Sequence, residues 1–202
     1  MNPARPRSRY DAAMSAHVPV PVLETPRLVL RGHSVTDLED SVALWSDPDV
    51  TRHISGKPST REEVWSRLLR YIGHWAVTGY GLWHIRDRAT DRFVGEAGLA
   101  DFKRDMLFSF DGAPEAGWVL APWCYGRGYA TEAMTAVLAW SAAAHPRTVC
   151  IINPGNVASL RVAAKLGYRE IGRAEYRASE VIVFERGDES VAVQSRPRDD
   201  AR

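Results

Sequence analysis

The chain has 202 residues, of which 45% are hydrophobic, and its formal net charge at pH 7 is +1. A chain of this length can bury one sizeable core, so we expect one domain with tails. Basic and acidic residues are nearly equal in number and scattered, which argues against partners such as nucleic acid or a membrane surface. No apolar run could span a bilayer and no signal-peptide core follows the N-terminal arginines, so the expected location is cytoplasmic. The two cysteines lack metal-ligand spacing, and no metal is expected.

The first elements follow an N-terminal stretch without periodicity. Residues 1–22 are rich in Pro, Arg and Ala and are expected to form a flexible leader. Residues 23–31 alternate after Pro26 and predict the first strand. Thr36 or Asp37 is expected to cap a helix that ends near Pro48, because proline disfavours helix in the residue before it. A loop is expected to follow.

A second helix has clear start and stop signals. It begins at a capping residue that has a glutamate three positions later, and five apolar residues then recur on one face: Val64, Leu68, Tyr71, Ile72 and Trp75. Residues 79–81 break this helix. Residues 82–86 and 93–99 are predicted to pair as a hairpin. Residues 102–114 could be a strand extension, a substrate-side loop or a contact in a homodimer, and the sequence leaves these alternatives open.

The C-terminal half alternates strands and helices. Its predicted elements are a strand at residues 115–121, a helix running towards Pro146, a strand at 148–152, a helix from Asn156 to Gly167, and two closing strands at 168–172 and 181–185. The two closing strands are expected to be antiparallel. Residues 188–202 are predicted to be a polar tail.

A glycine-containing turn joins the strand at 115–121 to the helix that follows. Gly126 and Gly128 lie one residue apart, which lets the backbone approach a ligand and adopt φ values closed to other residues. The next helix begins with N–H groups that lack intrahelical partners, and these groups and the helix dipole suit a pyrophosphate. Ordinary strand-to-helix turns also use glycine, so the two glycines alone do not identify a site.

Taken together and in order, several motifs are distinctive. They lie at residues 25–31, 115–120, 125–133, 156–159 and 165–168. With them, the chain resembles the GNAT superfamily of N-acetyltransferases and, within it, the RimJ and RimL branch that acetylates ribosomal-protein N-termini. The resemblance covers residues 24–186. It implies an α+β (α/β) GNAT fold over residues 23–187, with a mixed, mostly antiparallel sheet of about seven strands, splayed at its central strands, and about four helices.

The resemblance also implies acetyl-coenzyme A as co-substrate and an amine as acceptor. The pyrophosphate would lie on the amides of the glycine turn and the pantetheine beside the central strand. The implied coenzyme-binding residues are Val119, Leu120, Ala121, Tyr125, Gly126, Arg127, Gly128, Tyr129, Ala130, Thr131, Asn156 and Ser159. Asn156 could equally be a plain helix cap, and Arg127 could reach a phosphate or face water. The acceptor could be a protein N-terminal amine or a small-molecule amine.

Acetyl transfer to nitrogen requires a neutral amine and a stabilised oxyanion. A free α-amine has a pKa of about 7.7 to 8.0 and needs little help to lose a proton. Glu115 is the candidate base, acting through water, and the alternative is a strand-end carboxylate in solvent. A backbone N–H near Val119 or Leu120 is expected to hold the oxyanion. Many family members have a tyrosine acid where this chain has Ala163, and Ser159 is the remaining nearby hydroxyl.

Two further function classes are compatible with parts of the sequence. A module that binds an acyl-CoA without turnover is favoured by the missing tyrosine and disfavoured by the retained Glu115. A nucleotide-binding α/β domain is disfavoured because neither of its glycine-rich motifs follows a strand. Four tryptophans could line an acceptor cleft or belong to the core: Trp45, Trp75, Trp83 and Trp118. Four histidines are expected to be exposed or hydrogen-bonded: His33, His53, His74 and His84.

Overall fold

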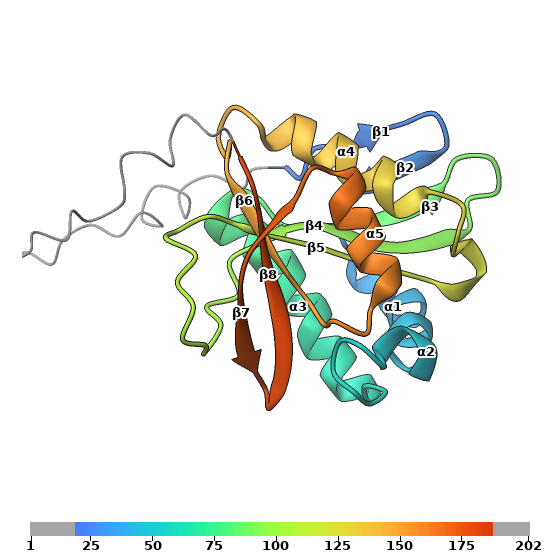
Figure 1. Cartoon of the computed structure of the whole chain (residues 1–202). Coiled ribbons are helices and arrows are strands. Elements are labelled where there is room, and N and C mark those ends of the chain that lie inside the picture. The colour runs from blue at the N-terminus through green and yellow to red at the C-terminus, as the bar shows by residue number, and fades with distance from the viewer. Residues whose placement is uncertain (1–18, 188–202) are drawn as a thin grey trace, which may run out of the picture.

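The computed structural model describes residues 19–187, and eight strands form its single sheet (Figure 1). They are β1 (Leu23–Glu24), β2 (Leu28–Arg31), β3 (Leu82–Asp87), β4 (Phe93–Ala100), β5 (Glu115–Leu120), β6 (Thr148–Ile152), β7 (Arg169–Tyr176) and β8 (Ser179–Arg186). The order is β1-β2-β3-β4-β5-β6-β8-β7. Every neighbouring pair is antiparallel except β5 with β6. The mixed, open sheet is confirmed. The predicted first strand at residues 23–31 is divided by a bend at Pro26 into β1 and β2, which pair with each other, so the sheet has eight strands instead of about seven.

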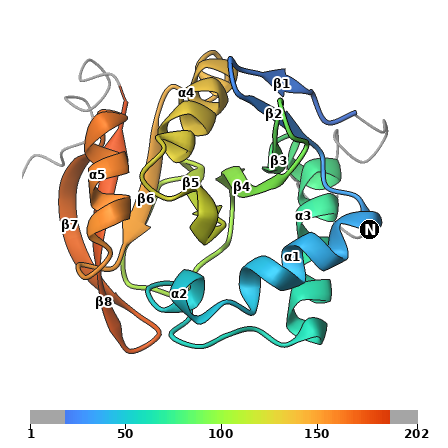
Figure 2. The ribbon, with the colours of Figure 1, turned by 90° about the vertical axis from the view of Figure 1, so that its right-hand side faces the viewer.

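Within residues 19–187, five α-helices cover the two faces of the sheet (Figure 2). They are α1 (Leu38–Trp45), α2 (Pro48–Thr51), α3 (Arg61–Thr78), α4 (Tyr129–Ser141) and α5 (Val157–Lys165). The first three lie on one side and α4 and α5 on the other. The additional helix is α2, a single turn inside the predicted loop. It forms because Asp47 caps it and Pro48 occupies its first position.

Helix α3 shows how local signals set the boundaries of an element. The Thr60 hydroxyl accepts the Glu63 N–H, and the Glu63 carboxylate accepts the Thr60 N–H, so both halves of the predicted capping box are present. Gly79 ends the helix with a φ of 77°. The predicted inner face is buried at Val64 and Tyr71 among other residues. The prediction of this helix is confirmed.

Tryptophans make up much of the core. Trp45, Trp75 and Trp83 are at most 3% exposed. The ring of Trp83 meets those of Trp75 and Trp140 edge to face, at centroid distances of 4.6 and 5.1 Å. Trp118 is partly buried and packs against the same cluster. The core alternative is therefore correct for the first three.

The sheet opens between β5 and β6. Over the described residues, the register of this parallel pair is a single position, Glu115 with Val149. The strands are neighbours at the start of β5 and diverge beyond it, as the predicted splay requires. Figure 2 shows α5 on the β6 side of this gap.

The packed part of the chain begins before residue 23. Trp83 Nε1 donates a hydrogen bond to the carbonyl oxygen of Pro21 (2.8 Å), and Val20 lies against Gly32. Most of the predicted leader and all of the predicted tail lie outside the described residues. No helix in the described part of the chain is both long and apolar enough for a membrane span.

Candidate functional site

The turn after β5 has the left-handed backbone that its glycines predict. Gly126 and Gly128 have φ values of 74° and 78°, which are costly for a residue with a Cβ. A short 3-10 turn over Pro122–Cys124 precedes them, and Gly128 is the N-cap of α4. The first N–H groups of α4 lack intrahelical acceptors by geometry, so with the helix dipole they suit an anion.

Hydrogen bonds between residues far apart in the sequence hold this turn in place. Arg27 Nε donates to Glu132 Oε2 and Thr25 Oγ1 donates to Glu132 Oε1, both at 2.6 Å. Arg27 Nη1 also donates to the carbonyl oxygen of Arg127 (2.9 Å). These contacts join the bend before β2 to the first turn of α4.

The side chains of the turn leave the amides as its main anion-binding groups. Tyr129 is buried, and its hydroxyl donates to Asp87 Oδ2 (2.8 Å). Tyr125 is 52% exposed. Arg127 is exposed, with its guanidinium 5.5 Å from the centre of the Trp123 ring. Arg127 therefore faces solvent here, and its contact with a phosphate stays a prediction.

The end of β5 is shaped by its neighbour β4. Leu120 lies opposite Gly95, where an added Cβ would be 2.2 Å from the carbonyl oxygen of Val119. The N–H of Ala121 donates to the carbonyl oxygen of Val94 (2.8 Å). Because the backbone groups of a strand alternate between its two sides, Val119 also faces β4, and Leu120 is the better candidate for pairing with a pantetheine arm on the side facing β6. A backbone contact by Val119 or Ala121 stays a prediction.

Asn156 is a helix cap in this structure. Its side-chain Oδ1 accepts the N–H of Ser159 (3.1 Å) at the first turn of α5. This bond does not use the amide nitrogen of the side chain, and a coenzyme contact by Asn156 stays a prediction. Ser159 is half-buried, and Ala163 is fully buried. The loop after α2 reaches this region, since a Cβ on Gly155 would lie 3.3 Å from His53 Cε1.

Glu115 is the buried carboxylate of the site. Its side chain is only 6% exposed, so the alternative of a solvent-facing strand end is wrong. Arg104 Nε donates to Oε2 (2.5 Å) and Arg104 Nη2 donates to Oε1 (2.6 Å). Burial raises the pKa of Glu115 above the usual carboxyl range, and the Arg104 guanidinium opposes the rise. Such a carboxylate is a suitable general base once an oxygen is free.

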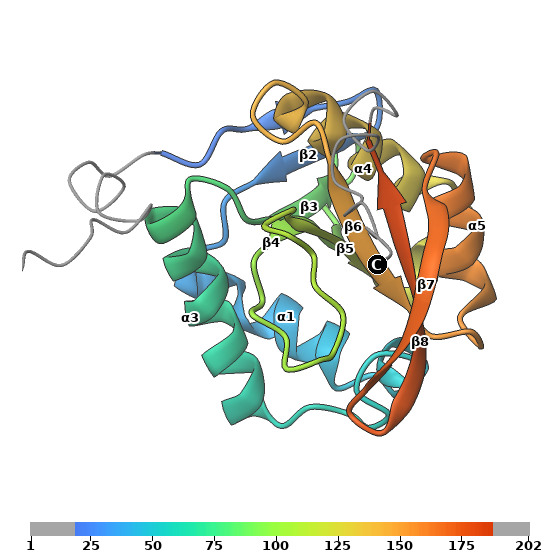
Figure 3. The same ribbon diagram turned by 60° about the vertical axis from the view of Figure 1, so that its left-hand side comes forward.

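A cavity of about 280 Å³ lies beside Glu115. Its other walls come from the loop between β4 and β5, including Phe102, Phe108 and Phe110. Figure 3 shows this loop between α3 and the β7–β8 hairpin. Phe108 rests against β7, because a Cβ on Gly172 would be 2.9 Å from its ring. Residues 101–114 contain no strand, so the strand-extension alternative is wrong. Their place in the cavity wall favours the substrate-side loop, and the homodimer contact stays a prediction.

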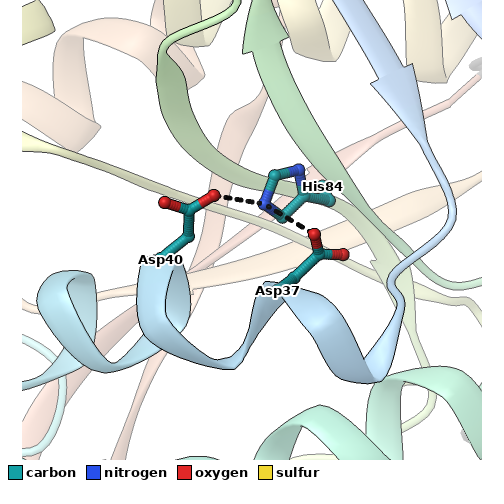
Figure 4. A group of neighbouring side chains, drawn as sticks. All are labelled: Asp37, Asp40 and His84. Atoms are coloured by element: carbon teal, nitrogen blue, oxygen red, sulfur yellow. Dashed lines mark ion pairs between the residues drawn. The ribbon is translucent and has the colours of Figure 1, made fainter.

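A second polar group lies between α1 and β3 (Figure 4). Asp37, Asp40 and His84 have ligand atoms within 4.8 Å of one another, a spacing that could hold a metal ion. Each carboxylate is already paired, however, Asp37 with Arg31 (2.7 Å) and Asp40 with Arg86 (2.9 Å). A dication would add two positive charges beside two guanidinium groups. We therefore interpret this group as structural, and the expectation of no metal stays a prediction.

His84 differs from what the sequence predicts for it. Its side chain is 0% exposed, and neither ring nitrogen has a hydrogen-bond partner. Nε2 lies 3.4 Å from Asp40 Oδ2 and 3.7 Å from Asp37 Oδ1. Burial lowers the pKa of His84 to about 4, so the ring is neutral at pH 7. His74 is hydrogen-bonded as expected, through Nδ1 to Tyr80 and Nε2 to the Asp101 N–H.

A family model described as an acetyltransferase (GNAT) domain matches residues 27–169. This chain belongs to the GNAT acetyltransferase family. The predicted fold and enzyme class are thereby confirmed: the protein is a GNAT-family N-acetyltransferase. The family transfers acetyl groups from acetyl-CoA, and the acceptor of this member is a separate question.

Relatives and solved structures agree with this assignment. The chain is 34% identical over 132 residues to the uncharacterized protein YkkB of Bacillus subtilis, covering 61% of this chain and 70% of YkkB. A GnaT-family acetyltransferase structure from Bordetella pertussis has 31% identity and a TM-score of 0.74 over 83% of this chain and 99% of its own. RimL, a ribosomal L7/L12 α-N-protein acetyltransferase solved with coenzyme A, has 17% identity and a TM-score of 0.68, covering 82% and 97%. At that identity, RimL shows a shared fold alone.

The sequence did not indicate two contacts of the site region. Arg104, the partner of Glu115, was only one charge among the aromatic residues of an unassigned loop. The contact of Arg27 with Glu132 joins two motifs that were recognised separately. Only the ordered recurrence of those motifs could have suggested that they touch.

Proposed function

We propose that this enzyme transfers the acetyl group of acetyl-CoA directly to a primary amine, in the manner of the RimJ and RimL branch. The acceptor is a protein N-terminal α-amine or a small-molecule amine. The observation that carries the proposal is the position of Glu115, a nearly buried carboxylate beside a cavity of about 280 Å³. Glu115 begins β5 and the anion-binding turn follows its end, as expected if a thioester lies between them.

The other residues have supporting roles in this proposal. The amides of residues 125–131 bind the pyrophosphate. The pantetheine lies beside Val119, Leu120 and Ala121 and pairs with the backbone of Leu120. A backbone N–H of β5 stabilises the oxyanion. Asn156 and Ser159 border the coenzyme from α5, and residues 23–187 form the catalytic domain.

The chemistry needs one base and little acid. Glu115, directly or through water, takes a proton from the acceptor ammonium, and the nitrogen lone pair attacks the thioester carbonyl. The C–N bond forms and the C–S bond breaks. The leaving thiolate takes the second proton from nitrogen, with Ser159 as the nearby hydroxyl. Because a thiol has a pKa of about 8.5, the thiolate leaves without a strong acid, and Ala163 in place of a tyrosine is tolerable.

The test is incubation with acetyl-CoA and a panel of peptide N-termini, small amines and lysine side chains, with free thiol as the readout. We expect α-amines to react faster than lysine ε-amines, which have a pKa of about 10.4 and are rarely neutral at pH 7. Silence across the panel, with coenzyme A binding intact by calorimetry, would contradict the proposal.

A non-catalytic acyl-CoA sensor is the second candidate. The closed Arg104–Glu115 pair and the absence of a tyrosine acid at Ala163 favour it. Under that reading, Glu115→Gln leaves coenzyme binding unchanged and there is no turnover to lose. Measurable acetylation that disappears in Glu115→Gln excludes it.

A further inference from the structure

The general base proposed above is blocked in this structure. Arg104 engages both oxygens of Glu115, through Nε and Nη2, in a bidentate pair. The two side chains are 18% and 6% exposed, so water competes little for either. A carboxylate held in this way is ionised, but both oxygens already face N–H donors. The acceptor ammonium cannot reach the carboxylate until the guanidinium moves away from it.

Arg104 has a second set of contacts that it can keep when it leaves Glu115. Its guanidinium carbon lies 4.8 Å from the centre of the Phe102 ring and 4.7 Å from that of Tyr176. Cations are attracted to aromatic faces at these distances. The guanidinium can therefore turn away from the carboxylate while it remains over the two rings.

The loop that carries Arg104 is fastened at its ends. The Asp101 N–H donates to His74 Nε2 (2.9 Å) on α3, and the carbonyl oxygen of Phe110 accepts from Arg147 Nη1 (3.0 Å). Between these points, Phe108 rests on β7, while Leu107 is fully exposed. The loop can thus shift between its two anchors without breaking the sheet.

The charges around the cavity match an incoming cation. Three carboxylates line it, Asp101, Asp111 and Glu115, against the two cations Lys103 and Arg104. When Arg104 turns away from Glu115, the carboxylate is left facing the cavity without its countercharge. An ammonium group, with its positive charge and three N–H donors, can then donate hydrogen bonds to Glu115 in place of the guanidinium.

We infer that Arg104 is a positioning residue that keeps Glu115 ionised in the resting enzyme and yields it to the ammonium of the acceptor, with residues 101–114 acting as a latch. The inference rests on the proposed function. Arg104 takes no part in bond making, because a guanidinium does not give up its proton in proteins. After transfer, Glu115 releases its proton to solvent and Arg104 returns.

The kinetic test compares Arg104→Gln with wild type at pH 8 and over a range of lower pH values. Without the competing guanidinium, we expect the acceptor KM to fall about 3- to 10-fold and the acetyl-CoA KM to stay within about twofold. In the plot of kcat/KM against pH, the rise on the acidic side (the acidic limb) should move to higher pH by about one unit, because Glu115 loses its countercharge. A raised acceptor KM with an unchanged acidic limb would overturn the inference.

Two variants separate positioning from a merely structural role. Arg104→Lys keeps the charge and should restore most of the acidic limb, even if Arg104→Gln folds poorly. Arg173→Gln is the matched control, since Arg173 pairs with Glu170 and Glu180 on the exposed part of β7 and β8. It should leave KM and the pH profile at wild-type values.

Two measurements need no turnover. Carboxyl ¹³C NMR of the ligand-free protein should give Glu115 a higher pKa in Arg104→Gln than in wild type. Amide hydrogen exchange at residues 101–114 should rise when a reactive amine and coenzyme A are added. If amines are acetylated but exchange stays constant, the latch is wrong and the proposed function stands. If no amine reacts while the NMR shift is present, the proposed function is wrong and the control of Glu115 ionisation by Arg104 stands.

Discussion

Two arginine–carboxylate pairs of this molecule have similar contacts and opposite protonation behaviour. The Asp37 side chain is 5% exposed and pairs with Arg31, while the Glu115 side chain is 6% exposed and pairs with Arg104. Burial alone would raise the pKa of Asp37, but Arg31 and the Ser34 N–H lower it to about 2. Burial raises the pKa of Glu115, and Arg104 does not reverse the rise.

The two carboxylates differ in depth of burial, which raises the pKa of Glu115 more strongly, and in the number of donors that they face. Asp37 accepts two hydrogen bonds from Arg31 and a third from the Ser34 N–H (2.7 Å), within the turn before α1. Glu115 takes its hydrogen bonds from Arg104, a side chain on a long loop. A carboxylate held by backbone and side chain together is fixed as an anion. A more deeply buried carboxylate held by a single side chain can change its protonation state more easily, which suits a base.

Removing the carboxylate of the second pair should have the largest effect. Glu115→Gln keeps the shape of the side chain but not its basicity, and we expect kcat to fall about 10²- to 10⁴-fold. Coenzyme A affinity, measured by calorimetry, should not change. Glu185→Gln is the control, because Glu185, which lies on β8, also pairs with an arginine, Arg147. A Glu115→Gln variant with full activity would remove Glu115 from the mechanism.

Removing the arginine of each pair tests the comparison through stability. Arg31→Met removes two of the three hydrogen bonds to Asp37 and leaves the Ser34 N–H, which still favours the ionised form, so we expect the free energy of unfolding to fall by about 2–3 kcal/mol. Arg104→Met should cost about half as much at pH 6, because Glu115 can become neutral. Urea unfolding of both variants measures the difference. Equal losses would mean that the two pairs are both structural.

The parts of the fold that were predictable depend on short-range rules. The capping box of Thr60 and Glu63 and the left-handed turn at Gly126 and Gly128 are written into adjacent residues. The alternation of residues 115–121 was enough to find β5. These elements therefore appear where the sequence predicts them.

The contacts that set protonation were not predictable in this way. Arg27 and Glu132 are separated by 105 positions, and no local sequence pattern indicates that they are in contact. Arg104 lies only 11 positions from Glu115, but the loop between them has no periodicity that fixes where its side chains point. His84 meets Asp37 and Asp40 only because α1 packs across β3 (Figure 4). The polar chemistry of the site required the tertiary structure.

The histidine beside the first pair predicts a pH effect on stability. The pKa of His84 is about 4 in the folded protein, against about 6.5 in the unfolded chain. Burial is the main cause of the lower value, and the positive charges of Arg31 and His33 lower it further. The carboxylates of Asp37 and Asp40 act in the opposite direction. The unfolded chain then binds more protons between these values, so this contribution is complete above pH 6.5 and is lost as pH falls towards 4. We expect wild type to lose about 2.5 kcal/mol more over this interval than His84→Leu. Urea unfolding at several pH values measures this, and equal slopes would contradict it.

The smallest effect should come from removing the Ser34 hydroxyl, which caps the turn before α1. The Ser34 hydroxyl accepts the Thr36 N–H at 3.3 Å, whereas the bond to Asp37 comes from the Ser34 backbone. Ser34→Ala therefore removes the cap and keeps the third donor, and we expect a loss of about 1 kcal/mol in the free energy of unfolding. The pKa of Asp37, followed by carboxyl NMR, should stay near 2 because its donors remain. A rise of the Asp37 pKa into the usual carboxyl range would show that the hydroxyl, and not the backbone, organises the first pair.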